Sequence, residues 1–225
     1  MFEVQEGGGV VTEWIISFCD LTGHMVEPWV QNGYRALLID PQHPKGVTRD
    51  GAITRLGHVV DDTHTWSMLR AIIRKDHVAF VSAFPPCTDL AVSGARWFEH
   101  KGRKDWAFQF KAMQIVWQCH SIAELLGAPY MIENPVSVIS SIWRKPDHTL
   151  SPSDFTAYEP NDNYNKQTML WTGGGFIMPK PRRDASLGLP DDRIHRAPPN
   201  AERANFRSAT PRGFARAVYE ANGEL

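Results

Sequence analysis

Short apolar runs typical of buried β-strands alternate along this chain with segments that have the pattern of helices. The run Val78–Ala83 is almost continuously apolar, as strands are when helices cover both faces of a parallel sheet. Further strands are expected at 14–18, 35–39, 59–60, 129–132 and 168–171, and helices at 22–32, 65–74, 104–126 and 211–221. This alternation predicts an α/β fold with a mainly parallel sheet flanked by helices.

The length and the charge distribution predict how the chain is organised. With 225 residues, the chain is expected to form a single domain over 1–225, with a core at 11–165, a basic loop-rich insert at 166–210 and a closing helix at 211–225. Residues 1–165 carry 14 basic and 19 acidic side chains, whereas residues 166–217 carry 10 basic and 4 acidic ones. The formal net charge of −1 excludes a protein that coats nucleic acid by charge alone.

The cysteines and the apolar runs bear on the cellular compartment. Cys19, Cys87 and Cys119 are odd in number and far apart, which favours a reducing compartment over a disulfide framework. No apolar run is long enough to span a bilayer, and the acidic N-terminus lacks the cationic region of a signal peptide. A cytoplasmic protein without membrane contact is therefore expected. No pair of His or Cys residues has a zinc-type spacing, so no metal is expected either.

Polar residues follow several of the predicted strands. Ligands of parallel α/β sheets bind beyond the carboxyl ends of the strands, so these residues are the candidates for a site. They are Cys19-Asp20, Asp40, Asp61-Asp62, Pro85-Pro86-Cys87 and Glu133-Asn134-Pro135.

Two of these strand ends carry reactive chemistry. Pro85 and Pro86 stiffen the turn that presents Cys87, and a thiol held in this way can act as a nucleophile. A free cysteine is, however, more often a small buried apolar residue. A carboxyl such as Glu133 at the end of a buried strand is costly to ionise, which makes it a candidate proton donor, or else a structural residue with its own partner.

Together these motifs resemble the DNA cytosine-5 methyltransferase family, in particular its short, phage-type members without a full target-recognition domain. The resemblance rests on the run from Pro85-Pro86-Cys87-Thr88 to Gly94, on Glu133-Asn134-Pro135, on the stretch 165–172 and on the run 209–218. It implies a Rossmann-like class I fold that uses S-adenosylmethionine, with DNA as partner, and it suggests a phage or prophage source.

The resemblance also implies roles for the catalytic residues. Cys87 would attack C6 of cytosine while Glu133 protonates N3, after which C5 accepts the methyl group. Asn134 would orient the loop or contact the base, and Pro86 belongs to the same turn.

A cofactor site follows from the same comparison. The glycine-rich first loop of the family corresponds to 18–23, in which only Gly23 is kept. Asp40 would hold the ribose hydroxyls, or is a turn residue before Pro41; Asp61 or Asp62 would contact adenine, or caps a helix. The residues implied for cofactor binding are Phe18, Asp20, Thr22, Gly23, Asp40, Asp61, Asp62 and Pro85.

Substrate contacts are expected from the loop that carries Cys87, here called the cysteine loop, and from the basic segment at 166–210. Phosphate binding by the arginines of the segment competes with a simpler interpretation, in which they pair with nearby acidic residues in a solvated loop. The near-neutral charge and the missing recognition domain keep methylation of a free cytosine nucleotide open as an alternative. The loss of glycines from the first loop, where Asp20 and Thr22 stand instead, keeps a catalytically silent binding protein open as another. The implied substrate-binding residues are Thr88, Lys166, Thr168, Arg182, Arg183 and Arg207.

Overall fold

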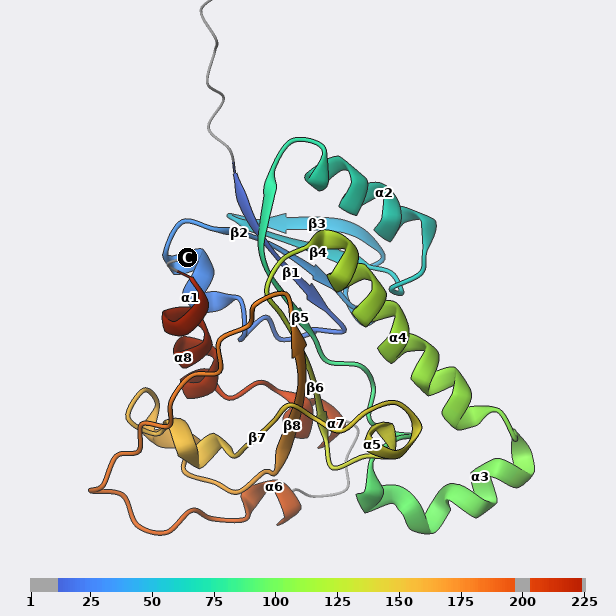
Figure 1. Ribbon diagram of the computed structural model, residues 1–225, viewed down its shortest axis with the longest axis vertical. Helices are drawn as coiled ribbons and strands as arrows, with labels where there is room; N and C mark the ends of the chain where they lie inside the picture. The colour runs from blue at the N-terminus through green and yellow to red at the C-terminus, as the bar shows by residue number, and fades with distance from the viewer. Residues whose placement is uncertain (1–11, 197–202, 224–225) are drawn as a thin grey trace, which may run out of the picture.

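The computed structural model describes residues 12–196 and 203–223. Residues 1–11, 197–202 and 224–225 lie outside the described residues. Several expectations fall on them: the absence of a signal peptide, the start of the predicted core, part of the predicted insert and the end of the closing helix. The fold is α/β, as predicted: helices flank an eight-stranded mixed sheet of order β3-β4-β2-β1-β5-β6-β8-β7 (Figure 1).

Five parallel strands form the centre of the sheet. They are β1 (Glu13–Phe18), β2 (Arg35–Ile39), β4 (Ile53–Gly57), β5 (His77–Ala83) and β6 (Tyr130–Pro135). From β1 the chain proceeds to β2 and β4 on one side, and then returns to β5 and β6 on the other. The order therefore reverses between β1 and β5, which is where open α/β sheets bind their ligands.

Antiparallel strands extend both edges of this centre. β3 (Gly46–Asp50) forms a hairpin with β4, and β8 (Thr168–Gly173) lies between β6 and β7 (His148–Leu150), antiparallel to both. The strand expected at Val59-Val60 is wrong, because these residues follow β4 in a turn. The hairpin of β3 and β4 forms this edge of the sheet instead. Its strands contain residues of mixed polarity, such as Thr48 and Arg55, which are register partners across the hairpin.

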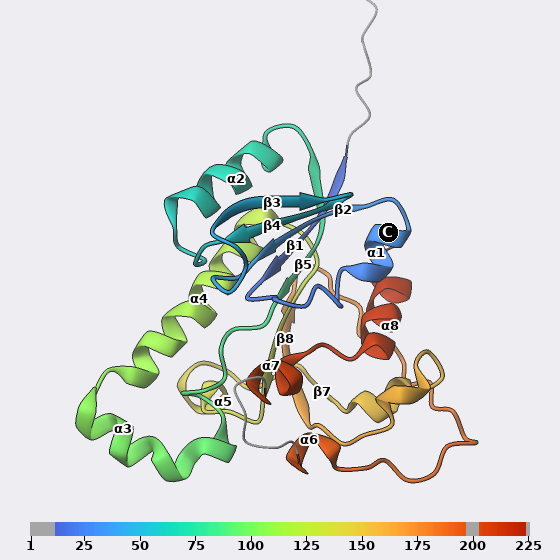
Figure 2. The same cartoon turned by 180° about the vertical axis from the view of Figure 1, so that it is seen from behind.

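Helices cover both faces of the sheet (Figures 1 and 2). α2 (Thr63–Ile73) and α4 (Phe108–Leu126) pack with Ile16 and Phe18 of β1, whereas α1 (Glu27–Gln31) and α8 (Arg212–Asn222) pack with Ile15. Alternate residues of a strand point to opposite faces, so β1 contributes to two separate apolar cores. Trp29 of α1 stacks on Phe80 of β5 in the second core, with ring centroids 5.0 Å apart.

Two expected helices are shorter than predicted. The helix expected at 22–32 is reduced to α1, and the helix expected at 104–126 begins only at Phe108, because Asp105 is extended (φ −146°) and ends α3 (Phe98–Lys104). The remaining elements are the short helices α5 (Ile139–Ile142), α6 (Arg193–Arg196) and α7 (Arg203–Ser208), and the 3₁₀ turns η1 (Val92–Trp97), η2 (Pro152–Phe155) and η3 (Pro160–Asp162).

Candidate active site

The loop after β1 has an unusual backbone conformation at the point where the strand order reverses. Cys19 adopts a positive φ of 53°, the only such non-glycine residue among those described, and its amide donates to the carbonyl of Ile39 at 2.7 Å. This conformation costs about 1–3 kcal/mol for a residue with a side chain, and such strain concentrates at functional sites. Gly23, at φ 73°, completes the turn.

Asp20 holds this loop together from the inside. Its buried carboxylate accepts hydrogen bonds from Ser17 Oγ at 2.8 Å, from the Gly23 amide at 2.7 Å and from Thr22 Oγ1 at 3.3 Å. Ser82 Oγ of β5 donates in turn to Ser17 Oγ at 2.8 Å. The carboxylate is thus engaged by the protein itself, and Asp20 shapes the backbone that the loop offers to a ligand.

Asp40 lies at the end of β2, the place expected for an acidic residue that holds ribose. It is 6% exposed, and one oxygen accepts from the Gln42 amide at 2.8 Å, which is the turn contact of the simpler interpretation. Burial raises the pKa of Asp40 above its ordinary value. The neighbouring His43 joins this turn to the loop after β1, because its Nε2 lies 3.0 Å from the Asp20 carbonyl oxygen.

Asp62 caps helix α2, so the simpler alternative for this residue describes the structure. Its carboxylate accepts from the His64 amide at 2.7 Å, and this bond lowers the pKa of Asp62. Asp61 accepts instead from Gln118 Nε2 of α4 at 3.1 Å.

The same cap gathers three groups that could hold a metal ion. Donor atoms of His58, Asp62 and His64 lie within 4.8 Å of one another, a grouping that the spacing of His and Cys residues did not predict. Both imidazoles approach the same oxygen, Asp62 Oδ1, at 3.3 and 2.9 Å, and their rings stack 4.6 Å apart. Hydrogen bonds and stacking are sufficient to account for this cluster.

The turn that carries Cys87 is fixed to the neighbouring strand. Asn134 of β6 is fully buried, and its Nδ2 donates to the carbonyl of Pro85 at 2.9 Å. Pro85 is buried as well, whereas Pro86 and Thr88 are exposed and Cys87 is partly exposed. Asn134 therefore holds the start of this turn against β6.

Glu133 and Lys166 form a largely buried ion pair beside Cys87. Lys166 Nζ lies 3.4 Å from Glu133 Oε1, with side chains 12% and 13% exposed. Burial raises the pKa of the Cys87 thiol, and the charge of Glu133 raises it further, while Lys166 and Arg207 of α7 act in the opposite direction. Four residues from separate parts of the chain therefore share one electrostatic environment.

Other predicted substrate residues are engaged elsewhere. Arg182 Nη1 donates to Tyr158 Oη at 2.9 Å and lies 3.5 Å from Glu220 of α8, and Arg183 pairs with Asp154 of η2. Thr168 is buried, and its hydroxyl donates to the Lys166 carbonyl at 3.2 Å.

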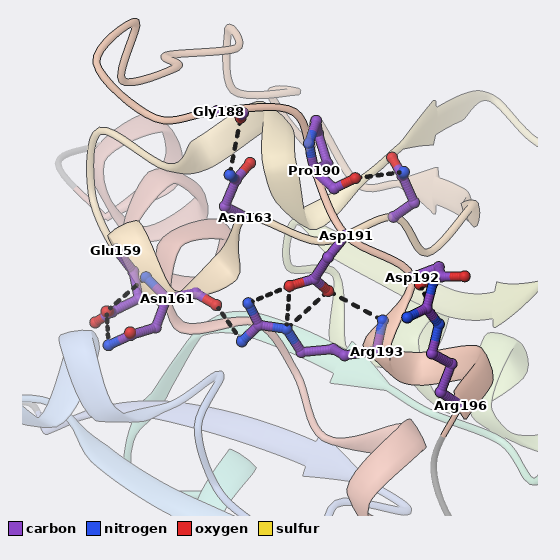
Figure 3. A network of polar contacts seen from close by, with 10 residues as sticks. Glu159, Asn161, Asn163, Gly188, Pro190, Asp191, Asp192, Arg193 and Arg196 are labelled. Atoms are coloured by element: carbon purple, nitrogen blue, oxygen red, sulfur yellow. Dashed lines mark hydrogen bonds and ion pairs between the residues drawn. The ribbon is translucent and has the colours of Figure 1, made fainter.

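Further along the basic segment, the arginines also pair with acidic neighbours. Figure 3 shows Arg193 held by both carboxylate oxygens of Asp191, and Arg196 paired with Asp192 at 2.8 Å. The interpretation as a solvated loop with internal ion pairs thus describes these arginines, and Arg207 differs from them in acting on Cys87.

Sequence reasoning missed the polar residues that support the site. Ser17, Ser82 and His43 are all buried, and they join the ends of β1, β2 and β5 through Asp20. The signal was present for the serines, because each is a polar residue within an otherwise apolar strand.

Comparison with known proteins gives little further information. No family model and no curated protein matches the sequence. Among solved structures, one from E. coli, provisionally described as a DNA modification methyltransferase encoded within a prophage, is similar at 10% identity with a TM-score of 0.42. The match covers 72% of this chain and 46% of that one, so this chain spans less than half of its length. A likeness this weak carries no argument about function.

Among the described residues, no helix has the length and apolar character needed to cross a membrane.

Proposed function

We propose that this protein is a Rossmann-like class I methyltransferase that transfers a methyl group from S-adenosylmethionine to C5 of cytosine in DNA. The observation that carries the proposal is the placement of Cys87 and Glu133 at the carboxyl ends of adjacent strands β5 and β6, where the charge of Glu133 acts on the thiol. A nucleophile and an acidic group so placed are what addition to a pyrimidine ring requires. The reversal of strand order beside them supports the fold assignment.

The residues around the strand reversal fit the cofactor. The turn at 19–23 brings backbone to the carboxyl end of β1, and Asp40 provides an acidic group for ribose hydroxyls at the end of β2. Asp20, Thr22 and Gly23 would hold the turn in shape, with Phe18 and Pro85 beside it. When bound, the sulfonium of S-adenosylmethionine supplies the methyl group.

The charges around Cys87 indicate how its reactivity would be controlled. With its raised pKa, the resting side chain is a neutral thiol. A Glu133 that carries the proton for N3 of the base no longer opposes ionisation of Cys87, whereas Lys166 and Arg207 continue to favour it. Nucleophile and acid are therefore expected to become active together, when a base occupies the site.

The chemical steps follow from this arrangement. The Cys87 thiolate adds to C6 while Glu133 protonates N3, which makes C5 an enamine carbon that accepts the methyl group. Loss of the C5 proton then expels Cys87 and restores the ring. In duplex DNA the target base has to leave the stack to reach Cys87. Thr88 follows Cys87 in the chain and Arg207 acts on its thiol, so these two are the candidates to contact the flipped nucleotide.

A second candidate substrate is a free cytosine nucleotide. Among the described side chains of the basic segment, ion pairs within the protein already engage Arg182, Arg183, Arg193 and Arg196, which leaves few cations for a duplex backbone. Arg207 alone could hold the phosphate of a mononucleotide.

The decisive experiment is mass spectrometry of nucleosides from cells that express the wild type, Cys87→Ser or Cys119→Ala. We expect 5-methylcytosine in DNA with the wild type and with Cys119→Ala, which removes a thiol from the core, but not with Cys87→Ser. Purified protein with labelled cofactor should label duplex DNA. Label in dCMP alone would replace DNA by the nucleotide, and no cofactor binding in calorimetry would favour a silent binding protein.

A further inference from the structure

One region of the surface carries all of the exposed aromatic side chains that the structure describes. We name residues 92–111, which comprise η1, α3 and the start of α4, the aromatic arm. Its Trp97, Trp106 and Phe110 are 54%, 89% and 56% exposed, whereas every other described Trp, Phe or Tyr side chain is buried or partly buried. Large exposed apolar groups that cluster in this way mark an interaction surface.

The aromatic arm also carries a net positive charge, whereas the whole chain does not. It carries five Lys or Arg and two acidic residues, against a net charge of −1 for the whole chain. Arg96 and Lys104 contact no carboxylate among the described residues, and the Arg96 guanidinium lies over the ring of Trp97, 5.3 Å from its centroid. A partner that combines negative charge with flat apolar faces complements this surface.

Contacts fix the arm to the cysteine loop. Lys101 Nζ donates to the carbonyl of Thr88 at 3.1 Å and to Asp89 Oδ1 at 2.5 Å, and Gln109 Nε2 donates to the Asp89 carbonyl at 3.3 Å. Figures 1 and 2 show α3 extending away from the sheet at the end of α4 that is far from α2. A polymer lying along the arm would thus continue toward Cys87.

We propose that the aromatic arm binds single-stranded nucleic acid, with unpaired bases stacked on Trp97, Trp106 and Phe110 and phosphates beside Arg96 and Lys104. Base faces are available for such stacking only where they are not already stacked in a duplex. An apolar protein surface is a poorer fit, because charged side chains separate Trp97 from Trp106 and Phe110 along the arm. This inference rests on the proposed function in one respect, namely that the base that reaches Cys87 is a cytosine. Binding of the strand to the arm does not depend on methyl transfer.

The test is fluorescence anisotropy of a labelled single-stranded oligonucleotide and of a duplex of equal length, with the full chain. We expect tighter binding of the single strand. Trp106→Ala should weaken it at least about fivefold, because a base–aromatic stack contributes that much or more. Leu125→Ala, which truncates an exposed apolar side chain at the other end of α4, is the matched control and should change nothing.

The charges are tested separately. The double variant Arg96→Ala, Lys104→Ala should reduce the slope of log affinity against log salt by about 1.4, the value for two phosphate contacts on a single strand. Arg49→Ala, which removes an exposed arginine of β3, should leave the slope unchanged.

Two results would overturn the proposal: equal affinity for single strand and duplex, or unchanged binding by Trp106→Ala. A special case of the second is a Trp106→Ala variant that binds normally but dissociates from dimer to monomer. The last result would assign the arm to a second copy of the chain. Normal single-strand binding without any methyl transfer would refute the proposed function and leave this inference standing, so the two failures are distinguishable.

Discussion

Replacing Lys166 by methionine is expected to destabilise the fold, because it leaves the charge of Glu133 buried without a partner. The two charged atoms are 3.4 Å apart and both side chains are less than one-seventh exposed. At an effective dielectric constant of about 20, their attraction is roughly 5 kcal/mol. Removal of one member of a buried pair typically costs about 3–5 kcal/mol. We therefore expect Lys166→Met to lower the free energy of unfolding by about 3 kcal/mol.

Urea denaturation near neutral pH measures this loss, which should shift the midpoint without changing the m-value. Adding Glu133→Gln to Lys166→Met removes the unpaired charge and should restore most of the stability, giving a coupling energy of about 2 kcal/mol or more in the double-mutant cycle. Lys145→Met is the control, because Lys145 is exposed and forms no ion pair in the described structure. A loss below about 1 kcal/mol, or no recovery in the double variant, would refute the role given to this pair.

Three further predictions concern the cofactor loop and the thiol. Gly23→Ala should lower the free energy of unfolding by about 1 kcal/mol or more, because φ is 73° there. The control is Gly188→Ala, where an added Cβ would meet no atom within 4 Å and stability should not fall. Equal urea midpoints for the two variants would contradict the prediction. Because burial raises the pKa of Asp40, its ionised form destabilises the fold as the pH rises above the ordinary value of 3.8. Asp40→Asn should thus be more stable than the wild type near neutral pH, with a difference that fades in acid, yet bind S-adenosylmethionine more weakly in calorimetry; unchanged affinity would remove Asp40 from the cofactor site. Glu133→Gln should speed alkylation of Cys87 by iodoacetamide at mildly alkaline pH, since it removes a charge that raises the pKa of the thiol; a slower reaction would show that another group controls it.

The centre of the fold could be predicted because its strands are buried on both faces. Continuous apolar runs gave β1, β2, β5 and β6 within a residue or three of their bounds. The hairpin of β3 and β4 could not be read in the same way, since a strand near the sheet edge such as 46–50 is only partly buried and keeps polar residues. A strand is predicted at Val59-Val60 instead, because both residues are apolar and β-branched. Val59 is in fact exposed and lies beyond the end of β4.

The site was predictable as far as it depends on neighbouring parallel strands. Cys87 and Glu133 follow adjacent strands, so their proximity comes from the sheet itself. The partner of Glu133 depends on where antiparallel β8 enters the sheet, and nothing local in the sequence specifies that register. Whether an arginine such as Arg182 faces solvent or an acidic neighbour is likewise decided by tertiary contacts.

The position of β8 between β6 and β7 also affects how the protein is made. As the chain emerges from the ribosome, β6 remains an open edge until residues 168–173 have emerged as well, because β8 is its partner on that side. β7 pairs with β8 alone, so it cannot join the sheet before β8 does. An exposed hydrophobic edge of this kind is prone to pair with other chains. Nascent chains should therefore depend most on chaperones while β6 has emerged from the ribosome and residues 168–173 have not.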